Sequence, residues 1–189
     1  MRWFLVTLVL LTCVAPAGAR GEDPRGYVLV DQHGARFRLA DLGGRPTFVT
    51  FVASRCSDAC PIADAVFARL LQRMKRQRVG ANLVTITLDP DYDTPFVMAR
   101  LAHEFTADPR RWRFASGDPA TVRALMRAFG IIAKNDARGI PDVHSTFVYL
   151  LDGHVRLART LLLSTDFVDE ALRAARAVRT TYDNLASSP

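Results

Sequence analysis

The amino-acid sequence predicts a three-layer α/β domain, in which helices flank a mixed central β-sheet. Two continuous runs of apolar, β-branched and aromatic residues, Thr47–Ala53 and Asn82–Leu88, are typical of strands buried on both faces of a sheet. Each run is followed by a segment of helical periodicity, as in strand–helix–strand units. An Asp152-Gly153 pair between two later apolar runs indicates an antiparallel hairpin, so we expect the sheet to be mixed.

The elements around the first buried strand are a hairpin before it and a helix after it. Tyr27–Val30 and Arg36–Leu39 flank Asp31-Gln-His-Gly34, in which Gly34 supplies the turn of an N-terminal β-hairpin. The helix takes Pro61 as its first residue and ends near Gly80. Its apolar residues recur at helical spacing and are Ile62, Val66, Phe67, Leu70, Leu71 and Met74.

The second half of the chain continues with two helices whose starts are marked by capping residues. Thr94-Pro95 and Asp118-Pro119 each place a cap before a proline at the first helical position, and these helices end near Phe105 and Gly130. The order of all elements matches the thioredoxin-like fold. The remaining predicted elements are the strands Trp112–Ala115, Thr146–Leu151 and His154–Leu162 and a last helix from Thr165 to about Leu185.

Residues 1–19 have the features of a secretory signal peptide. Arg2 precedes an apolar run that ends at Val14, and Ala17-Gly18-Ala19 matches a small-x-small cleavage site. We expect cleavage after Ala19, which leaves residues 20–189 as a single domain. One alternative is a retained membrane anchor, although the run is shorter than the ~20 apolar residues that cross a bilayer. The other is a lipoprotein with Cys13 as the lipidated residue.

The net charge of +6 is carried almost entirely by arginine, since Lys75 and Lys134 are the only lysines. Two groups of arginines recur at the spacing of helix surfaces, so solvated helix faces explain them better than an anionic partner or membrane surface does. They are Arg69, Arg73 and Arg76, and Arg173, Arg176 and Arg179. The sequence lacks the interleaved basic and aromatic residues of a nucleic-acid-binding surface. We therefore expect no nucleic-acid partner.

Two cysteines in Cys56-Ser-Asp-Ala-Cys60-Pro61 separate the first buried strand from the helix. With Pro61 as the first helical residue, Cys60 is predicted at the N-cap, where unpaired N–H groups and the helix dipole favour a thiolate. Cys56 can approach it closely enough to form a disulfide or a two-sulfur metal clamp. A purely structural disulfide is the plainer alternative, but it would close a very short loop and add little stability.

The third candidate ligand is His144, in Pro141-Asp-Val-His-Ser-Thr146 directly before a predicted strand. In the thioredoxin topology this position faces the cysteines, whereas His33, His103 and His154 fall in a turn, a helix and a hairpin. Two thiolates and one imidazole suit Cu(I), which is soft and accepts few ligands, whereas structural zinc usually has four. Copper is therefore the favoured metal.

Asp89 ends the second buried strand near the same edge of the sheet. One interpretation is that its carboxylate tunes the metal site from outside the ligand shell. The other is a turn and helix-capping role that it shares with Asp91 and Asp93.

Taken together, these segments resemble the SCO/SenC family of copper metallochaperones. The resemblance rests on Cys56–Pro61, Leu88–Pro95 and Val143–Ser145 in this order and spacing, and it extends from about Gly26 to Ala175. It implies a thioredoxin-like fold in which the two cysteines and the histidine bind copper for the dinuclear centre of cytochrome c oxidase.

Two positions depart from the pattern of that family. Ser57 stands where members commonly have a proline after the first cysteine, and Val143 stands where they often have an aspartate before the histidine. Neither change removes a predicted ligand. Both leave the branch of the family, and hence the copper acceptor, open.

The leading hypothesis is a periplasmic metallochaperone, soluble or held at the outer face of the inner membrane. Cys56, Cys60 and His144 hold Cu(I), or also Cu(II), and pass it by ligand exchange to the copper-bearing subunit of cytochrome c oxidase. Other periplasmic copper carriers and thiol reductases are further candidate partners. The alternative is a thiol–disulfide reductase in which Cys56 and Cys60 are redox-active toward an oxidase subunit or another exported protein. His144 separates the two, because copper binding requires it and thiol exchange does not.

Overall fold

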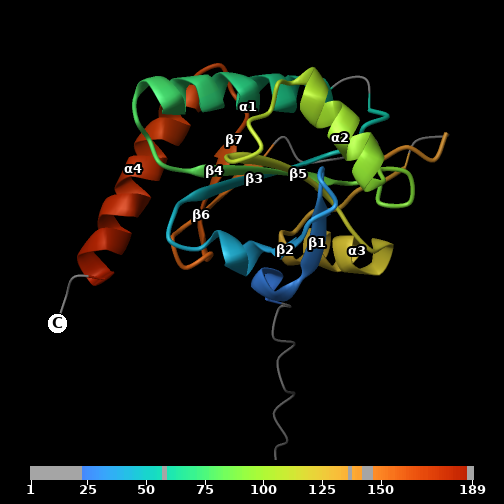
Figure 1. Cartoon of the computed structure of the whole chain (residues 1–189), viewed down its shortest axis with the longest axis horizontal. Helices are drawn as coiled ribbons and strands as arrows, with labels where there is room; N and C mark the ends of the chain where they lie inside the picture. Colours follow the sequence, from blue (N-terminus) through green and yellow to red (C-terminus); the bar gives the residue numbers. More distant parts are fainter. Residues whose placement is uncertain (1–22, 57–58, 136–137, 142–146, 187–189) are drawn as a thin grey trace, which may run out of the picture.

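A computed structural model describes residues 23–56, 59–135, 138–141 and 147–186 (Figure 1), without the side chains of residues 59, 60 and 184–186. The predicted signal segment 1–19, Cys13 included, lies outside these residues. No helix in the described part of the chain has both the length and the apolar character needed to cross a membrane. The elements in order are the 3₁₀ turn η1 (Pro24–Gly26), β1 (Val28–Asp31), β2 (Arg36–Arg38), the 3₁₀ turn η2 (Leu39–Leu42), β3 (Thr47–Val52), α1 (Ala59–Arg76), β4 (Asn82–Thr87), α2 (Pro95–Glu104), β5 (Trp112–Ser116), α3 (Pro119–Ala128), β6 (Phe147–Leu151), β7 (Leu157–Leu162) and α4 (Phe167–Ala186).

A mixed sheet of seven strands forms the central layer, in the order β2-β1-β5-β4-β3-β6-β7. The three middle strands β5, β4 and β3 are parallel to one another, and β6 and β1 join them antiparallel at the two sides. β3 and β4 pair residue by residue from Thr47↔Asn82 to Val52↔Thr87, so the two strands end level with each other. All six residues of β3 are buried, as its continuous apolar run predicts.

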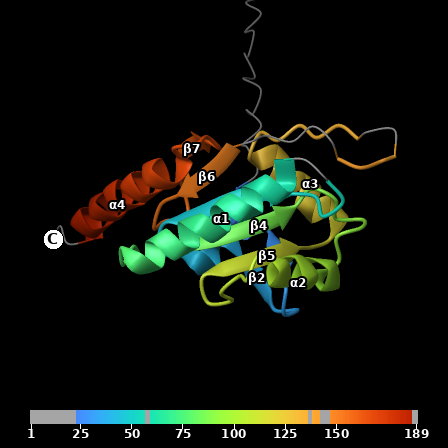
Figure 2. The same ribbon diagram turned by 90° about the horizontal axis from the view of Figure 1, so that it is seen from above.

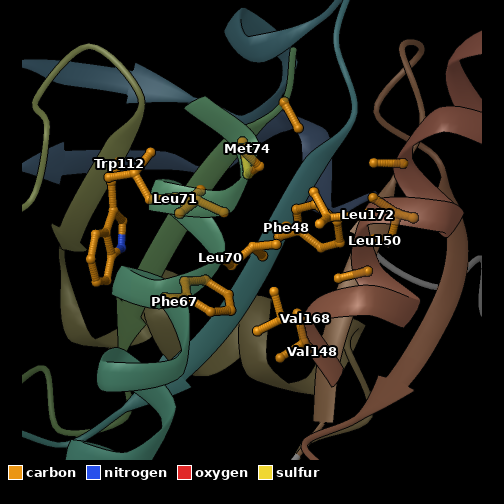
Figure 3. Packing of buried hydrophobic residues seen from close by; sticks show 14 of the residues in the cluster. Phe48, Phe67, Leu70, Leu71, Met74, Trp112, Val148, Leu150, Val168 and Leu172 are labelled. Atoms are coloured by element: carbon orange, nitrogen blue, oxygen red, sulfur yellow. The ribbon is translucent and has the colours of Figure 1, made fainter. Parts of the chain in front are cut away.

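Helices cover both faces of this sheet. α1, α2 and α4 lie on one face, where Figure 2 shows α1 between the other two, and α3 lies on the opposite face. The larger core cluster joins α1, α2 and α4 to the sheet and contains Phe48, Phe67 and Trp112, each fully buried (Figure 3). A second cluster under α3 contains the aromatic group Phe51, Phe129 and Tyr149. The predicted three-layer architecture is therefore confirmed.

Two predicted helix starts are confirmed by their hydrogen bonds. The Val97 amide donates to Thr94 Oγ1 at 3.4 Å before α2, and the Thr121 amide donates to Asp118 Oδ2 at 3.0 Å before α3. In each helix a proline occupies the first position. A short polar side chain that accepts from the first turn, followed by a residue with fixed φ, marks a helix start from local sequence alone.

The start of α1 differs from the prediction. The helix begins at Ala59, so Cys60 lies within its first turn rather than at the N-cap, and Pro61 is the third helical residue. Proline fits anywhere in a first turn because the N–H groups there have no intrahelical acceptor, so Pro61 does not define the first position. The packed side of α1 also excludes Ile62, which is 59% exposed.

The hairpin between β6 and β7 forms as predicted, but its turn is longer than the two residues Asp152-Gly153. The Asp152 amide donates to the Arg156 carbonyl and the Val155 amide to the Asp152 carbonyl, both at 2.9 Å, so β7 begins only at Leu157. The residue with positive φ is Val155, at 60°, rather than Gly153. The first hairpin has the same hydrogen bonds from Asp31 to Ala35, but there Gly34 takes the positive φ of 79°.

Candidate metal centre

The predicted ligands belong to segments that meet at one edge of the sheet. β3 and β4 run parallel and end level, at Val52 and Thr87, so the loops that follow them are neighbours. β6 runs antiparallel to β3 with the register Val49↔Tyr149, so β6 starts at the edge where β3 ends. The topology therefore brings the cysteine loop, the loop containing Asp89 and the start of β6 to this edge.

Cys56 is half-buried at the end of the loop that follows β3. Its amide donates to the Ala53 carbonyl at 3.0 Å, which closes a turn directly after the strand. Its side chain packs against Val52 and Ala63, so it contacts both the end of β3 and the first turns of α1. Cys56 is thus held between the sheet and the helix that carries Cys60.

The backbone of Cys60 lies in the first turn of α1, four residues after Cys56, and its side chain is outside the description. His144 lies outside the described residues. It precedes Phe147, the first residue of β6, by three residues, a distance of at most ~10 Å along the chain. The described side chains include no group of three histidine, cysteine, aspartate or glutamate residues able to hold a metal ion. Only Cys56 of the predicted ligands is among them, so the ligand set stays a prediction.

Asp89 forms a hydrogen-bonded ion pair with Arg55, the residue that precedes Cys56. Arg55 Nε and an Arg55 terminal nitrogen donate to Asp89 Oδ2 at 2.9 and 2.5 Å, and the Arg55 guanidinium lies 4.4 Å from the centre of the Tyr92 ring. The Asp89 carboxylate, through its hydrogen bond and its charge, raises the pKa of Arg55. The carbonyl of Asp89 also accepts from the Tyr92 and Asp93 amides, at 3.0 and 2.8 Å. Asp89 therefore anchors the cysteine loop and shapes a turn at the same time, and Thr94 is the helix cap.

Asp93 is a fully buried carboxyl group beneath the cysteine loop, which the sequence interpretation assigned only to a turn or cap. It accepts hydrogen bonds from the Ser54 amide at 3.1 Å, from the Ser54 hydroxyl, and from Thr87 Oγ1 at 2.6 Å. Its backbone carbonyl accepts from the Ser116 hydroxyl. Burial raises the pKa of Asp93, and the Ser54 and Thr87 donors oppose the rise. One residue thus joins the ends of β3, β4 and β5.

Asp64 is a second buried acid, which sequence interpretation missed. It is 1% exposed on α1 and accepts a hydrogen bond from Thr85 Oγ1 of β4 at 3.0 Å. Burial raises the pKa of Asp64 to about 8, and the hydrogen bond from Thr85 opposes the rise. The available signal was its spacing, because Phe67 and Leu71, three and seven residues later, lie on the packed face of the helix.

Exposed apolar side chains lie on segments that begin at this edge. Ile62 lies in the first turns of α1, Phe96 in the first turn of α2, and Tyr92 in the loop after β4. Phe96 is 76% exposed. The edge that carries Cys56 therefore combines a half-buried thiol, an anchored arginine and apolar side chains open to solvent.

The amino-acid sequence matches one protein family and several of its known members. A family model described as SCO1/SenC matches residues 19–179. The SCO1 protein homolog of Bacillus subtilis is 23% identical over 157 residues, which cover 78% of this chain and 81% of the relative.

Solved structures also resemble the chain. A SCO1/SenC family lipoprotein from Bacillus anthracis has a TM-score of 0.74 at 21% identity, covering 80% of this chain and 92% of that one. Bradyrhizobium japonicum ScoI with copper bound has a TM-score of 0.70 at 27% identity, covering 80% and 96%. BsSco, described as a member of the Sco family of cytochrome c oxidase assembly proteins with a disulfide switch, has a TM-score of 0.71 at 18% identity, covering 82% and 91%. These likenesses confirm the predicted thioredoxin-like fold.

Proposed function

Because this chain belongs to the SCO1/SenC family, we propose that it carries copper as cargo, bound by Cys56, Cys60 and His144, and delivers it for cytochrome c oxidase assembly. The observation that carries the proposal is the meeting of three segments at one edge of the sheet. Cys56 packs against the first turns of α1, where Cys60 lies, and β6 starts at the same edge, three residues after His144. Solved relatives hold copper, and one is described as a cytochrome c oxidase assembly protein.

The proposed donor set favours Cu(I). Thiolates are soft ligands, imidazole is compatible with copper, and a site of low coordination number suits the monovalent ion. Loading forms two S–Cu bonds as the two thiols lose their protons to solvent. An acceptor protein would then replace the ligands one after another, so that the metal never leaves a coordinating group. We infer that the acceptor is the copper-bearing subunit of the oxidase.

The proposed location is outside the cytoplasm. Export would follow from the signal peptide at residues 1–19, with cleavage after Ala19 or retention of the segment as an anchor. A lipoprotein among the solved relatives supports a position close to the membrane. Residues 20–189 then form the working domain.

A Cu(I) titration tests the proposal directly. The reduced protein is titrated anaerobically against a competing Cu(I) chelator, together with Cys56→Ser, Cys60→Ser and His144→Ala. His154→Ala is the matched control, since His154 lies in the β6–β7 hairpin and contacts the Tyr182 ring. We expect one copper per chain, lost with either serine variant, weakened with His144→Ala and unchanged with His154→Ala. Equal affinity in His144→Ala and His154→Ala would remove His144 from the ligand set.

A thiol–disulfide reductase is the second candidate function. Its support is the position of Cys60 in the first turn of α1, where unpaired N–H groups and the helix dipole favour a thiolate. In that reaction the thiolate attacks a partner disulfide, the partner sulfur leaves as a thiolate, and the second cysteine resolves the mixed disulfide. Oxidase assembly in cells distinguishes the two functions. A His144→Ala variant that restores assembly while Cys56→Ser does not would favour the reductase.

A further inference from the structure

The C-terminal halves of α1 and α4 lie side by side on one face of the sheet (Figure 2). A terminal guanidinium nitrogen of Arg73 donates to Asp169 Oδ1 at 2.6 Å. Farther along both helices, a terminal nitrogen of Arg176 donates to Gln77 Oε1 at 2.5 Å. Because the residue numbers rise together, the two helices run in the same direction and their exposed sides form one continuous surface.

The packing brings together arginines that the sequence interpretation assigned to two separate solvated helix faces. Residues 73–79 contain four cations, residues 173–179 contain three, and neither segment contains an acidic residue. These seven charges exceed the net charge of +6 of the whole chain, so the excess positive charge of the protein is concentrated here. We call the two segments together the basic surface, and its cations are Arg73, Lys75, Arg76, Arg78, Arg173, Arg176 and Arg179.

Neighbouring carboxylates neutralise only part of the basic surface. Three ion pairs, with nitrogen–oxygen distances of 2.6, 2.8 and 3.5 Å, join Arg73 to Asp169, Lys75 to Asp108 and Arg179 to Asp183. The other four cations are exposed and form no ion pair with a carboxylate of the described residues; they are Arg76, Arg78, Arg173 and Arg176. Their guanidinium groups are therefore available to oxygen anions such as phosphate, which they match in geometry.

The basic surface carries charge without an apolar anchor. All large apolar side chains that are exposed in the described part of the chain lie outside residues 73–79 and 173–179. Met74, Val79 and Val178 of these segments pack in the core instead. A protein interface usually buries apolar and aromatic side chains at its centre, and a helix that inserts into a bilayer needs a free apolar face. The basic surface has neither feature, so a layer of anionic groups fits it better than a protein partner does.

We propose that the basic surface docks the folded domain on an anionic membrane, by contact of its arginines with lipid phosphate groups and without insertion. The attraction adds up over the unpaired arginines and is weakened by salt, because the charges lie in water. The proposal goes beyond copper transport and does not depend on it. It requires only the charge distribution and the location outside the cytoplasm proposed above.

The length of α1 separates the basic surface from the proposed metal centre. Cys60 lies in the first turn of α1 and Arg76 is its last residue, so the two are 16 residues apart, a rise of about 24 Å along the helix. A domain docked through the basic surface therefore leaves the loop that carries Cys56 open to another protein. Docking would concentrate the protein at the membrane without covering its reactive edge.

Chemical modification of arginine tests the proposal in the full chain. Phenylglyoxal, which reacts with guanidinium groups, is added to the protein with vesicles of phosphatidylcholine alone or mixed equally with phosphatidylglycerol, and mass spectrometry locates the modified residues. We expect the anionic vesicles to slow modification at Arg76, Arg173 and Arg176 several-fold. The exposed Arg36 of β2 and Arg100 of α2 are internal controls whose rates should not change. Equal rates on both kinds of vesicle, or equal protection of all five sites, would overturn the inference.

Charge reversal gives a second readout with a matched control. The double variant Arg76→Glu/Arg173→Glu should bind anionic vesicles more weakly in co-sedimentation, since each removed arginine weakens binding by about five-fold. The same variant should also lose the protection of Arg176. Arg36→Glu/Arg100→Glu changes the net charge equally and should behave as wild type.

The remaining outcomes decide between the basic surface and its alternatives. If both double variants lose binding equally, overall charge is responsible and the basic surface is not a docking site. If Arg76→Glu/Arg173→Glu does not fold, Arg76→Gln/Arg173→Gln replaces it, with a smaller loss expected. Protection of the same arginines by an acidic protein but not by anionic vesicles would assign the surface to a protein partner and overturn the membrane inference. Binding to phosphatidylcholine alone measures any contribution of residues 1–19, so a retained apolar segment does not change the comparison.

Discussion

Arg55 links the cysteine loop to the end of β4 through two hydrogen bonds to Asp89 and through its contact with the Tyr92 ring. Removal of the carboxylate by Asp89→Ala releases the residue that precedes Cys56. We expect Cu(I) affinity to fall by about ten-fold, because groups that orient a ligand segment typically contribute at this level. Chelator competition measures the change.

The control for this prediction lies in the same loop. Asp91 forms an exposed ion pair with Arg123 at 3.0 Å, and exposed pairs contribute little. Asp91→Ala should therefore leave the affinity within about two-fold of wild type. If both variants lose affinity equally, overall charge rather than the anchor is responsible.

Gly153 lies against the ring of Tyr182 near the end of α4. A Cβ at this position would approach three ring carbons at 2.5, 2.6 and 2.8 Å. Gly153→Ala should lower the free energy of unfolding by about 1–3 kcal/mol, the usual range for overpacking. Urea denaturation measures the loss, and Tyr182→Ala in the same chain should remove most of it. Gly26→Ala, with open space around its Cβ, serves as the control; an equal loss there would contradict the steric explanation.

At the scale of elements, the packing of α1 on β4 buries the Asp64 carboxyl and makes the stability of the fold depend on pH. Its pKa is 3.8 in the unfolded chain and about 8 in the folded one. Between these values the folded state binds more protons, so the free energy of unfolding falls as pH rises. The fall is up to about 1.4 kcal/mol per pH unit from this group. Below pH 4 its contribution is complete, and above pH 8 it changes no further.

Asp64→Asn should remove this slope. Urea denaturation at pH 5, 6, 7, 8 and 9 compares the variant with wild type, and the variant should gain stability relative to wild type up to pH 8. Asp166→Asn, which removes an exposed acid, should follow the wild-type curve. Parallel curves for wild type and Asp64→Asn would show that the buried carboxyl does not titrate in this range.

Local sequence predicted the elements best where a single short-range interaction defines them. The starts of α2 and α3 follow from a cap and a proline, and β3 from its continuous apolar run. The predicted start of α1 at Pro61 was wrong because proline is compatible with several positions in the first turn of a helix. The predicted start of β7 at His154 was wrong because the turn extends to Val155. Val155 is 4% exposed, and its burial holds this β-branched residue at a positive φ, which local preference would assign to a glycine.

The candidate site was predictable only in part. Cys56 and Asp89 were identified from motif and strand position, and the structure places both at the expected edge. The roles of Asp64 and Asp93 depend on hydroxyl groups of Thr85, Thr87 and Ser54, which lie on other strands and loops. Such contacts arise only when β3, β4 and the helices are assembled, so no local pattern reveals them. Cys60 and His144 as ligands stay predictions.

At the scale of the whole molecule, the proposed metal would join the segment before β6 to the segment between β3 and α1. A ligand that binds only the folded state stabilises it, by about 4 kcal/mol at 1,000 times its Kd. We expect one equivalent of Cu(I) to raise the unfolding temperature by several degrees under anaerobic calorimetry. Cys56→Ser should lose most of this increase, and an equal increase in that variant would indicate binding elsewhere.

The buried carboxyl of Asp93 also constrains how such a chain can diverge. Ser54 and Thr87 both direct hydroxyl groups at it from the ends of β3 and β4. An apolar residue at position 93 would leave the fully buried Thr87 hydroxyl without its acceptor, at a cost of about 1–3 kcal/mol, and would remove the acceptor of the half-buried Ser54 hydroxyl as well. We therefore expect substitutions at positions 54, 87 and 93 to occur together in related sequences, because the three side chains form one hydrogen-bonded group beneath the cysteine loop.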